Sequence, residues 1–188
     1  MPDENAHDEI AALKRIIEIT GLLNTTLDLD ELLQQIMTSA AELLGAETSS
    51  LLLVDEASGD LNILTATGES GQQVTRRQVP AHQGIAGWVV DNGEAAVVES
   101  PKDDPRFYAV MDAAIQFETR NMVAVPLKVR DDTIGVVEVI NKREGVFTEM
   151  DASLAQALAN QAAIAIDNAR LYARLADAVV TSRMSYRL

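Results

Sequence analysis

The sequence predicts one mixed α/β (α+β) domain, with a central antiparallel sheet of about six strands and its terminal helices packed on one face. Two runs rich in Val and Ile, 121–129 and 133–140, are separated by Arg130-Asp131-Asp132 and predict a hairpin in the middle of that sheet. Directly afterwards, Thr148-Glu149-Met150-Asp151 has the pattern of a capping box that starts a long helix. A chain of 188 residues is long enough for one such domain with a sizeable core.

Earlier segments supply the remaining elements. Residues 8–23 have the 3–4–3 apolar spacing of a narrow helical seam, and a second helix from Asp28 to Gly45 has a broad apolar face suited to covering a sheet. Further elements follow in chain order: strands at 49–54 and 61–67, a loop at 68–77, a short helix at 85–91, a strand at 95–99 and a short helix at 106–114.

The last helix is expected to run from about Glu149 to at least Ala178. Its residues step by four and three along one seam, formed by Leu154, Leu158, Gln161, Ala165, Asn168, Tyr172, Leu175 and Val179. A helix of this length exceeds the width of a small domain, so the seam predicts a homodimer through the terminal helices; a helix that caps its own domain and frays at the end is the alternative. We therefore divide the chain into an N-terminal dimer or signalling helix (1–27), a central domain (28–172) and a C-terminal helical extension (173–188).

Charge excludes several classes of partner. The chain has 15 Lys+Arg against 29 Asp+Glu, for a formal net charge of −14. So acidic a surface argues against nucleic acid and anionic membranes as partners, because both are bound through clustered cations. The polar, acidic start of the chain does not resemble a signal peptide, and no apolar stretch is long enough to span a bilayer, so we expect a cytoplasmic protein.

Little in the sequence suggests catalysis. There is no cysteine, which excludes disulfides, thiolate metal sites and cysteine nucleophiles. His7 lies in a polar tail and His82 has no second candidate ligand nearby, so no metal site is predicted. Neither a Gly-x-Ser-x-Gly motif nor a phosphate-binding Gly-rich loop is present, and we predict that the chain is not an enzyme.

One acidic residue interrupts an apolar strand face. Side chains alternate across a strand, so Glu138 is expected to share a face with Ile134, Val136 and Ile140. Burying a carboxylate is costly unless it is paired or hydrogen-bonded. Either this face opens onto a cavity at Glu138, or a cation or N–H group meets the acid there.

Several segments resemble the GAF domains of cyclic-nucleotide phosphodiesterases and bacterial adenylyl cyclases. Asn141-Lys142, Phe147 and Asp151 match the family signature. Where the signature ends in an acid, this chain has Ala152. In the same order as in the family, three earlier segments also match: Gln83-Gly84-Ile85-Ala86-Gly87-Trp88, Asp104-Pro105-Arg106-Phe107-Tyr108 and Phe117-Glu118-Thr119-Arg120-Asn121. The resemblance implies that Lys142 and Asp151 form an internal salt bridge, which is a structural role.

The resemblance also implies a ligand pocket on the sheet face opposite the terminal helices, with cyclic AMP or cyclic GMP as the favoured ligand. By this resemblance Ser49 or Ser50 would face the purine, Ile85 would pack on it, and Glu138 would reach it from the central strand. Asp112 and Thr119 would flank the segment that covers it.

Two features depart from cyclic-nucleotide binders. Ile115 stands where some of them have Thr, and Thr67-Gly68 stands where they have Phe-Asp.

We therefore predict a regulatory sensory domain of a signal-transduction protein, which binds a small molecule and relays its presence through the terminal helices to an output domain or partner. The alternative is a dimerisation and relay module that binds no ligand. Stabilisation of the folded chain by a nucleotide would separate the two, because a ligand selective for the native state raises its stability.

Overall fold

A six-stranded antiparallel sheet forms the middle layer of the protein, in the order β3-β2-β1-β6-β5-β4. The computed structural model describes residues 29–69 and 71–185, with the backbone alone from 175 onward. The strands are β1 (Ala46–Val54), β2 (Leu61–Ala66), β3 (Gln78–Val79), β4 (Ala96–Val98), β5 (Met122–Val129) and β6 (Asp132–Lys142). The helices are α2 (Leu29–Leu43), α3 (Gly71–Val74), α4 (Gly84–Asn92), η1 (Pro101–Asp103), α5 (Val110–Ile115) and α6 (Glu149–Ser185). The predicted fold class and strand number are confirmed.

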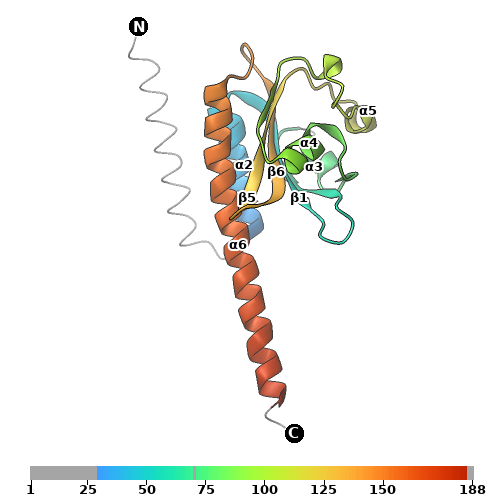
Figure 1. Ribbon diagram of the computed structural model, residues 1–188. Helices are drawn as coiled ribbons and strands as arrows, with labels where there is room; N and C mark the ends of the chain where they lie inside the picture. Colours follow the sequence, from blue (N-terminus) through green and yellow to red (C-terminus); the bar gives the residue numbers. More distant parts are fainter. Residues whose placement is uncertain (1–28, 70, 186–188) are drawn as a thin grey trace, which may run out of the picture.

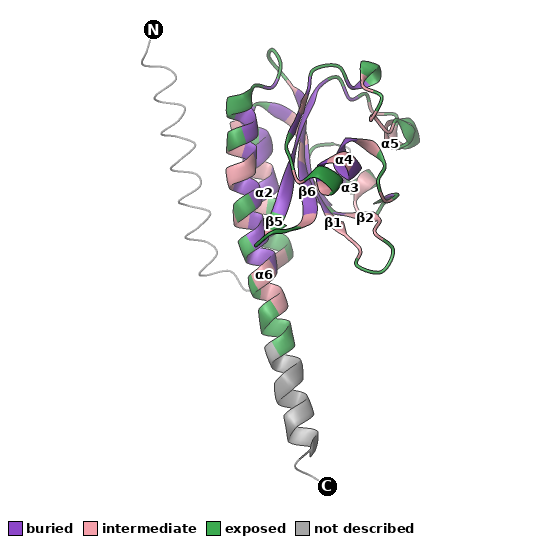
Figure 2. Ribbon diagram, in the orientation of Figure 1, coloured by how far each residue is buried: buried purple, intermediate pink, exposed green. Residues whose placement is uncertain are grey.

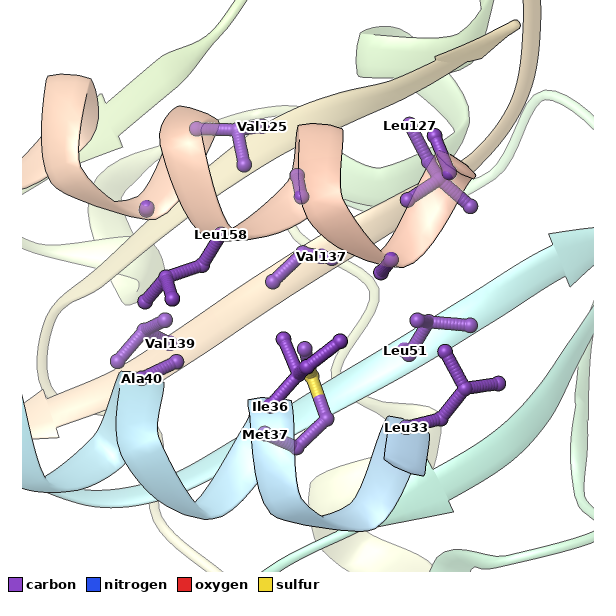
Figure 3. Packing of buried hydrophobic residues seen from close by; sticks show 14 of the residues in the cluster. Leu33, Ile36, Met37, Ala40, Leu51, Val125, Leu127, Val137, Val139 and Leu158 are labelled. Atoms are coloured by element: carbon purple, nitrogen blue, oxygen red, sulfur yellow. The ribbon is translucent and has the colours of Figure 1, made fainter. Parts of the chain in front are cut away.

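Two helices, α2 and α6, lie side by side on one face of the sheet (Figure 1). Figure 3 shows the core between them, where Ile36 and Met37 of α2 and Leu158 of α6 lie against the sheet residues Val137 and Val139. This is the larger of the two apolar clusters of the described residues, and its largest side chains are almost fully buried. Apolar residues recur about every 3.6 residues along the helices and every second residue along the strands. Each helix and each strand therefore presents an apolar face to this core.

The opposite face of the sheet is covered by α4, α5 and the segment between them (Figure 1). A second apolar cluster lies there, and it includes Ile85 and Val89 of α4 together with Leu52, Met122 and Val136 of the sheet. Figure 2 shows that the sheet is buried between these layers, whereas α5 is exposed. The sheet therefore separates a helix-packed side from a side that is covered by short elements.

Local structure differs from the sequence prediction at three places. Residues 68–77, predicted as a loop, contain α3, and the short strand β3 follows them. The helix predicted at 106–114 begins four residues later, at Val110. Ile134 does not share the face of Val136, because it is an extra residue between the pairs Leu127↔Gly135 and Lys128↔Thr133, and this bulge turns its side chain toward the helix-side core.

The helix α6 is longer than the sheet is wide and continues past it (Figure 1). Its 37 residues would span about 55 Å at 1.5 Å per residue. Leu158 and Ala165, which the sequence prediction placed on a dimer seam, instead pack in the core of their own domain, with 0% and 6% exposure. The outward side carries a different apolar set, with Ile164 at 49% and Leu171 at 43% exposure. The part of the seam prediction that rests on Leu158 and Ala165 is wrong, because the sheet occupies that side of the helix.

Asn141 ties the end of β6 to two other segments. Its side chain donates to Glu47 Oε2 and to the Glu118 carbonyl, each over 2.9 Å, and accepts from Arg120 N–H over 2.8 Å. Its φ of +61° is in the left-handed region, which Asn tolerates better than most residues. Both the conformation and the buried hydrogen bonds therefore require an asparagine at this signature position.

The predicted salt bridge between Lys142 and Asp151 is confirmed. Asp151 Oδ2 accepts from Lys142 Nζ, from the backbone N–H of Thr148 over 2.7 Å and from its hydroxyl over 3.0 Å. The predicted capping box is also present, because Asp151 N–H donates back to Thr148 Oγ1 over 3.3 Å. Phe147 is buried beside the pair, with Lys142 Nζ 5.6 Å from its ring centroid. Ala152 packs in the helix-side core, so no acid is accommodated there.

We predict that Asp151→Ala lowers the free energy of unfolding by about 2–4 kcal/mol, because it removes the helix cap and leaves Lys142 without its partner in a partly buried site. Glu118→Ala is the matched control, since the Lys102–Glu118 pair is 67% and 63% exposed and should contribute little. Denaturant titration of both variants checks this. Equal effects of the two substitutions would contradict the structural role of the signature pair.

Candidate functional site

A cavity of about 90 Å³ lies on the sheet face opposite α2 and α6. Its apolar walls come from the sheet, from Ile85 and Ala86 at the start of α4, and from Phe107, Tyr108 and Met111. The last three belong to residues 101–119, which contain η1 and α5 and which we call the cover. The cavity thus lies between a rigid sheet and a segment of short, partly exposed elements.

Glu138 is the acid that this cavity encloses. The residue itself is partly buried, but the surroundings of its carboxyl are poor enough in water to raise its pKa to about 7. The nearby charge of Asp112 raises this pKa further, and a hydrogen bond from Ser50 Oγ over 3.3 Å opposes the shift. A carboxyl that is half protonated near neutral pH, in a cavity, is a typical feature of functional sites.

Asp112 and Thr119 are hydrogen-bonded to each other within the cover. Asp112 Oδ2 accepts from Thr119 N–H over 2.7 Å, and its Oδ1 accepts from the Thr119 hydroxyl over 2.8 Å. Thr119 is buried although it follows the exposed part of the cover. Both residues line the cavity, so the contact that shapes the cover also contributes polar atoms to the site.

A second set of contacts attaches the cover to α4. The Arg106 side chain donates to Asp104 through Nε over 2.9 Å and through Nη2 over 2.7 Å, and its guanidinium lies 4.6 Å from the Trp88 ring centroid. The hydrogen bonds from Arg106 hold the pKa of Asp104 below its usual value. The matching motifs of α4 and of residues 104–108 are therefore in contact in space.

Gly84 allows the close approach of these two segments. It has a φ of +75°, and a β-carbon at this position would lie 3.1 Å from the Tyr108 β-carbon. A larger residue would be strained in this conformation and would push the cover away from α4.

Five of the six predicted ligand-binding residues meet at this cavity: Glu138, Ile85, Asp112 and Thr119 line it, and Ser50 reaches it through its hydrogen bond to Glu138. Ser49 does not, which resolves the choice between the two serines. Because neighbouring side chains of a strand point to opposite faces, Ser49 faces α2 and donates to the Met37 carbonyl over 2.6 Å. Whether the other five bind a ligand stays a prediction.

Sequence reasoning did not assign Phe107, Tyr108 or Met111 to the site. Phe107 and Tyr108 lie in the segment 104–108 that resembles the GAF family. Their position directly before the segment with Asp112 and Thr119 could have indicated that they line the site. Met111 had no signal, because its placement depends on the path of the cover.

A larger hollow, of about 670 Å³, lies between α2, β2 and α3. It is lined mainly by polar residues such as Gln34, Gln72 and Thr75, and it contains none of the predicted site residues. We assign the candidate site to the smaller cavity, because an acid on an otherwise apolar sheet face is unusual, whereas a hollow lined mainly by polar residues is common at a protein surface.

No metal centre is found in the part of the chain that the structure describes. His82 is exposed, and its Nδ1 lies 2.8 Å from Asp91 Oδ1. Within 29–69 and 71–185 no group of three or more His, Cys, Asp or Glu residues is arranged to hold a metal ion. Over the same residues, no helix combines the length and the apolar character needed to cross a membrane.

The sequence model of the GAF domain family matches residues 28–166. The chain belongs to the GAF family. This family is a regulatory, sensory fold of signalling proteins, so the predicted resemblance and the regulatory class are confirmed.

Individual relatives agree with this assignment. Over 202 aligned residues the GAF chain is 26% identical to the probable 3',5'-cyclic phosphodiesterase pde-5 of Caenorhabditis elegans, covering 98% of this chain and 27% of the relative. The chain thus spans about a quarter of that protein. Among solved structures, the GAF domain of a phosphoenolpyruvate-protein phosphotransferase from Coxiella burnetii superimposes with a TM-score of 0.77 at 21% identity, covering 87% of this chain and 96% of the other.

The free methionine-R-sulfoxide reductase of Neisseria meningitidis also shares the fold. Its TM-score is 0.72 at 20% identity, with 86% of this chain and 91% of the other covered. Regulatory and catalytic proteins therefore share this architecture. Similarity to these structures is evidence for the fold and not for a function.

We predict that Glu138→Gln stabilises the folded GAF domain by an amount that depends on pH. Below pH 4.5 the acid is protonated in both states, and its charge has no effect. Between pH 4.5 and about 7 the unfolded chain ionises first, so wild-type stability falls, by roughly 3 kcal/mol at most. The difference between variant and wild type, measured by denaturant titration, should therefore grow over this range and then level off.

Glu144→Gln is the control, since Glu144 is exposed in the turn after β6. This substitution should change stability far less than Glu138→Gln over the same range, because surface substitutions usually have small effects. A flat difference for Glu138→Gln would show that water reaches this carboxyl freely in the folded state.

Proposed function

We propose that this GAF domain senses a small molecule in the cavity beneath the cover and relays its presence through α2 and α6. The observation that carries the proposal is Glu138, an acid enclosed on a face that is otherwise apolar. An apolar residue at this position would give a more stable empty domain. The presence of the acid is therefore explained best by a polar ligand.

The sheet offers a direct path from the cavity to the terminal helices. Glu138 on the cavity face alternates along β6 with Val137 and Val139, which pack against α2 and α6 on the other face. A ligand that moves β6 or its backbone therefore acts on side chains in contact with both helices. Lys142, at the end of the same strand, is paired with the first turn of α6.

Cyclic AMP and cyclic GMP are the ligands favoured by the family resemblance, and the relation to a probable cyclic phosphodiesterase supports them. A cavity of about 90 Å³ is smaller than the roughly 300 Å³ at which small-molecule pockets begin. Binding of a nucleotide would therefore require the cover to move outward, a motion that its exposed contacts, such as Lys102–Glu118, permit.

We predict that millimolar cyclic AMP or cyclic GMP raises the melting temperature, and that Glu138→Gln and Thr119→Ala each reduce the rise. The first variant removes the negative charge and replaces one acceptor oxygen for purine N–H groups by an NH2 donor, and the second loosens the cover. Glu144→Gln again serves as the control. Calorimetry that detects no heat for either nucleotide on ligand-free protein would reject cyclic nucleotides as ligands and favour the ligand-free relay module.

We further propose that α6 forms a homodimer through its outward side. On that side Ala157, Gln161, Ile164, Asn168 and Leu171 follow one another by four and three residues, the spacing of a two-stranded coiled coil. The apolar members Ile164 and Leu171 are exposed within one chain, and a second copy would bury them. The N-terminal helix predicted at 8–23 lies outside the described residues.

We predict that Leu171→Asp shifts the protein from dimer to monomer in light scattering at micromolar concentration, because it places a charge in the apolar seam. Ala173→Asp is the matched control, since it adds the same charge two residues away, at an exposed position on the opposite side of the repeat. A monomeric wild type at this concentration would contradict the dimer.

The remaining parts of the proposal concern the context of the domain. We propose that it acts by regulating an output domain or partner and not by catalysis, in keeping with a chain without cysteine. The cytoplasmic location and the exclusion of nucleic acid and membranes as partners stay predictions from the sequence.

A further inference from the structure

The polar groups around the cavity carry negative charge or no charge. Among the described residues that line it, Glu138 and Asp112 are acids and none is Lys, Arg or His. They reach it from two separate elements, β6 and α5. The other polar side chains among the lining residues are those of Thr119 and Tyr108, which carry hydroxyls. An anionic group placed here would meet two carboxyls and no cation, at a site where burial strengthens electrostatic interactions.

The acceptor capacity of Asp112 is already used in part by Thr119, which donates to both of its oxygens. Glu138 is different, because the structure gives it one long hydrogen bond of 3.3 Å, from Ser50 to Oε2. An ionised carboxylate can accept several hydrogen bonds. Glu138 is therefore the group of this cavity with acceptor capacity left for a ligand.

Aromatic and soft side chains complete the site. Phe107, Tyr108 and Met111 of the cover face the same cavity as Glu138. Aromatic faces attract cations, and an acid beside them fixes the position of an N–H donor. The volume of about 90 Å³ limits the occupant to a few non-hydrogen atoms unless the cover moves.

From these observations we infer that the closed cavity selects a small nitrogen ligand that is cationic or rich in N–H donors, such as an amidine or a primary amine, and disfavours anions. Glu138 accepts the hydrogen bonds of this ligand, and the cover closes over its apolar part. The inference rests on the proposed sensing function and names the class of ligand for it. It concerns the closed cavity, whereas binding of a cyclic nucleotide requires the cover to move outward; in the closed cavity a cyclic phosphate would bring a negative charge toward Asp112 and Glu138.

Three probes of the same planar shape test the inference: acetamidinium, acetamide and acetate, which are a cation, a neutral molecule and an anion. Each is titrated into the ¹⁵N-labelled protein at constant ionic strength and pH 8, and amide shifts are followed by NMR. So small a ligand binds weakly, so the titration extends into the millimolar range. We expect acetamidinium to shift the amides around Ser50 and Glu138 and to bind at least about tenfold more tightly than acetate.

Variants and pH identify the group responsible. Glu138→Gln keeps the shape of the side chain and should remove the preference for acetamidinium, whereas Glu144→Gln should keep it. Lowering the pH from 8 to 6 should weaken acetamidinium binding to wild type, because Glu138 gains a proton, and should leave the Gln variant unchanged. The titratable groups that face Glu138 across the cavity are Asp112 of α5 and Tyr108 of the cover; none comes from α4, β2 or β3.

Acetate binding as tightly as acetamidinium would overturn the inference, as would a preference that survives Glu138→Gln. The absence of cavity shifts with all three probes would also overturn it. The proposed sensing function is judged separately, by amide shifts in α6. Cavity shifts without shifts in α6 support the ligand class and contradict the relay. Shifts in α6 caused by cyclic AMP or cyclic GMP, and unaffected by Glu138→Gln, support the relay and contradict the ligand class.

Discussion

The position of the cover depends on one buried side chain, that of Asn141. Its amide satisfies a carbonyl at Glu118, an N–H at Arg120 and the carboxylate of Glu47, so it joins the end of the cover to β1 and β6 at one point. Its left-handed backbone also turns the chain so that the next residue, Lys142, can reach Asp151. A residue without the amide would leave these groups unsatisfied in a place that water reaches poorly. The fold and the cavity therefore share this attachment.

The two faces of the sheet are packed differently. Residues such as Val137 and Val139 are fixed by dense packing against α2 and α6, where a change in volume costs stability. The other face is covered by short elements that are tied by ion pairs and by the Arg106–Trp88 contact, which can rearrange at lower cost. Dense packing on one face and short, partly exposed elements on the other would suit the proposed relay, in which a change begins at the cavity and reaches α2 and α6.

Much of this arrangement could be predicted from local patterns. The hairpin, the long helix and its capping box follow from periodicity and from residues close together in sequence, and the odd position of Glu138 follows from strand alternation. The two serines illustrate the limit. Which of Ser49 and Ser50 faces the cavity depends on the phase of β1, and this is set by the contact of Ser49 with α2, twelve residues earlier. The bulge at Ile134 likewise arises from pairing with β5, and the sequence of β6 alone does not predict it.

The seam of α6 shows the same limit on a larger scale. Ala, Leu and Ile occur on several sides of this helix. More than one stripe of residues along it therefore has the alternating spacing of four and three that is typical of a coiled coil. Only the packing of Leu158 and Ala165 against the sheet shows which stripe belongs to the domain, and the stripe through Ile164 and Leu171 is then left for a partner. Residues that serve a core and residues that serve an interface carry the same apolar signal, so tertiary structure decides between them.

The proposed site depends most on the enclosure of Glu138 beneath the cover, as opposed to its exposure at the surface of the sheet. An NMR titration of the side-chain carboxyl carbon of Glu138, in ¹³C-labelled ligand-free protein, measures this directly and requires no ligand. An enclosed carboxyl should titrate with a midpoint near pH 7. A midpoint close to the usual 4.5 would contradict this enclosure, because water would then solvate this carboxylate as it does at any exposed position.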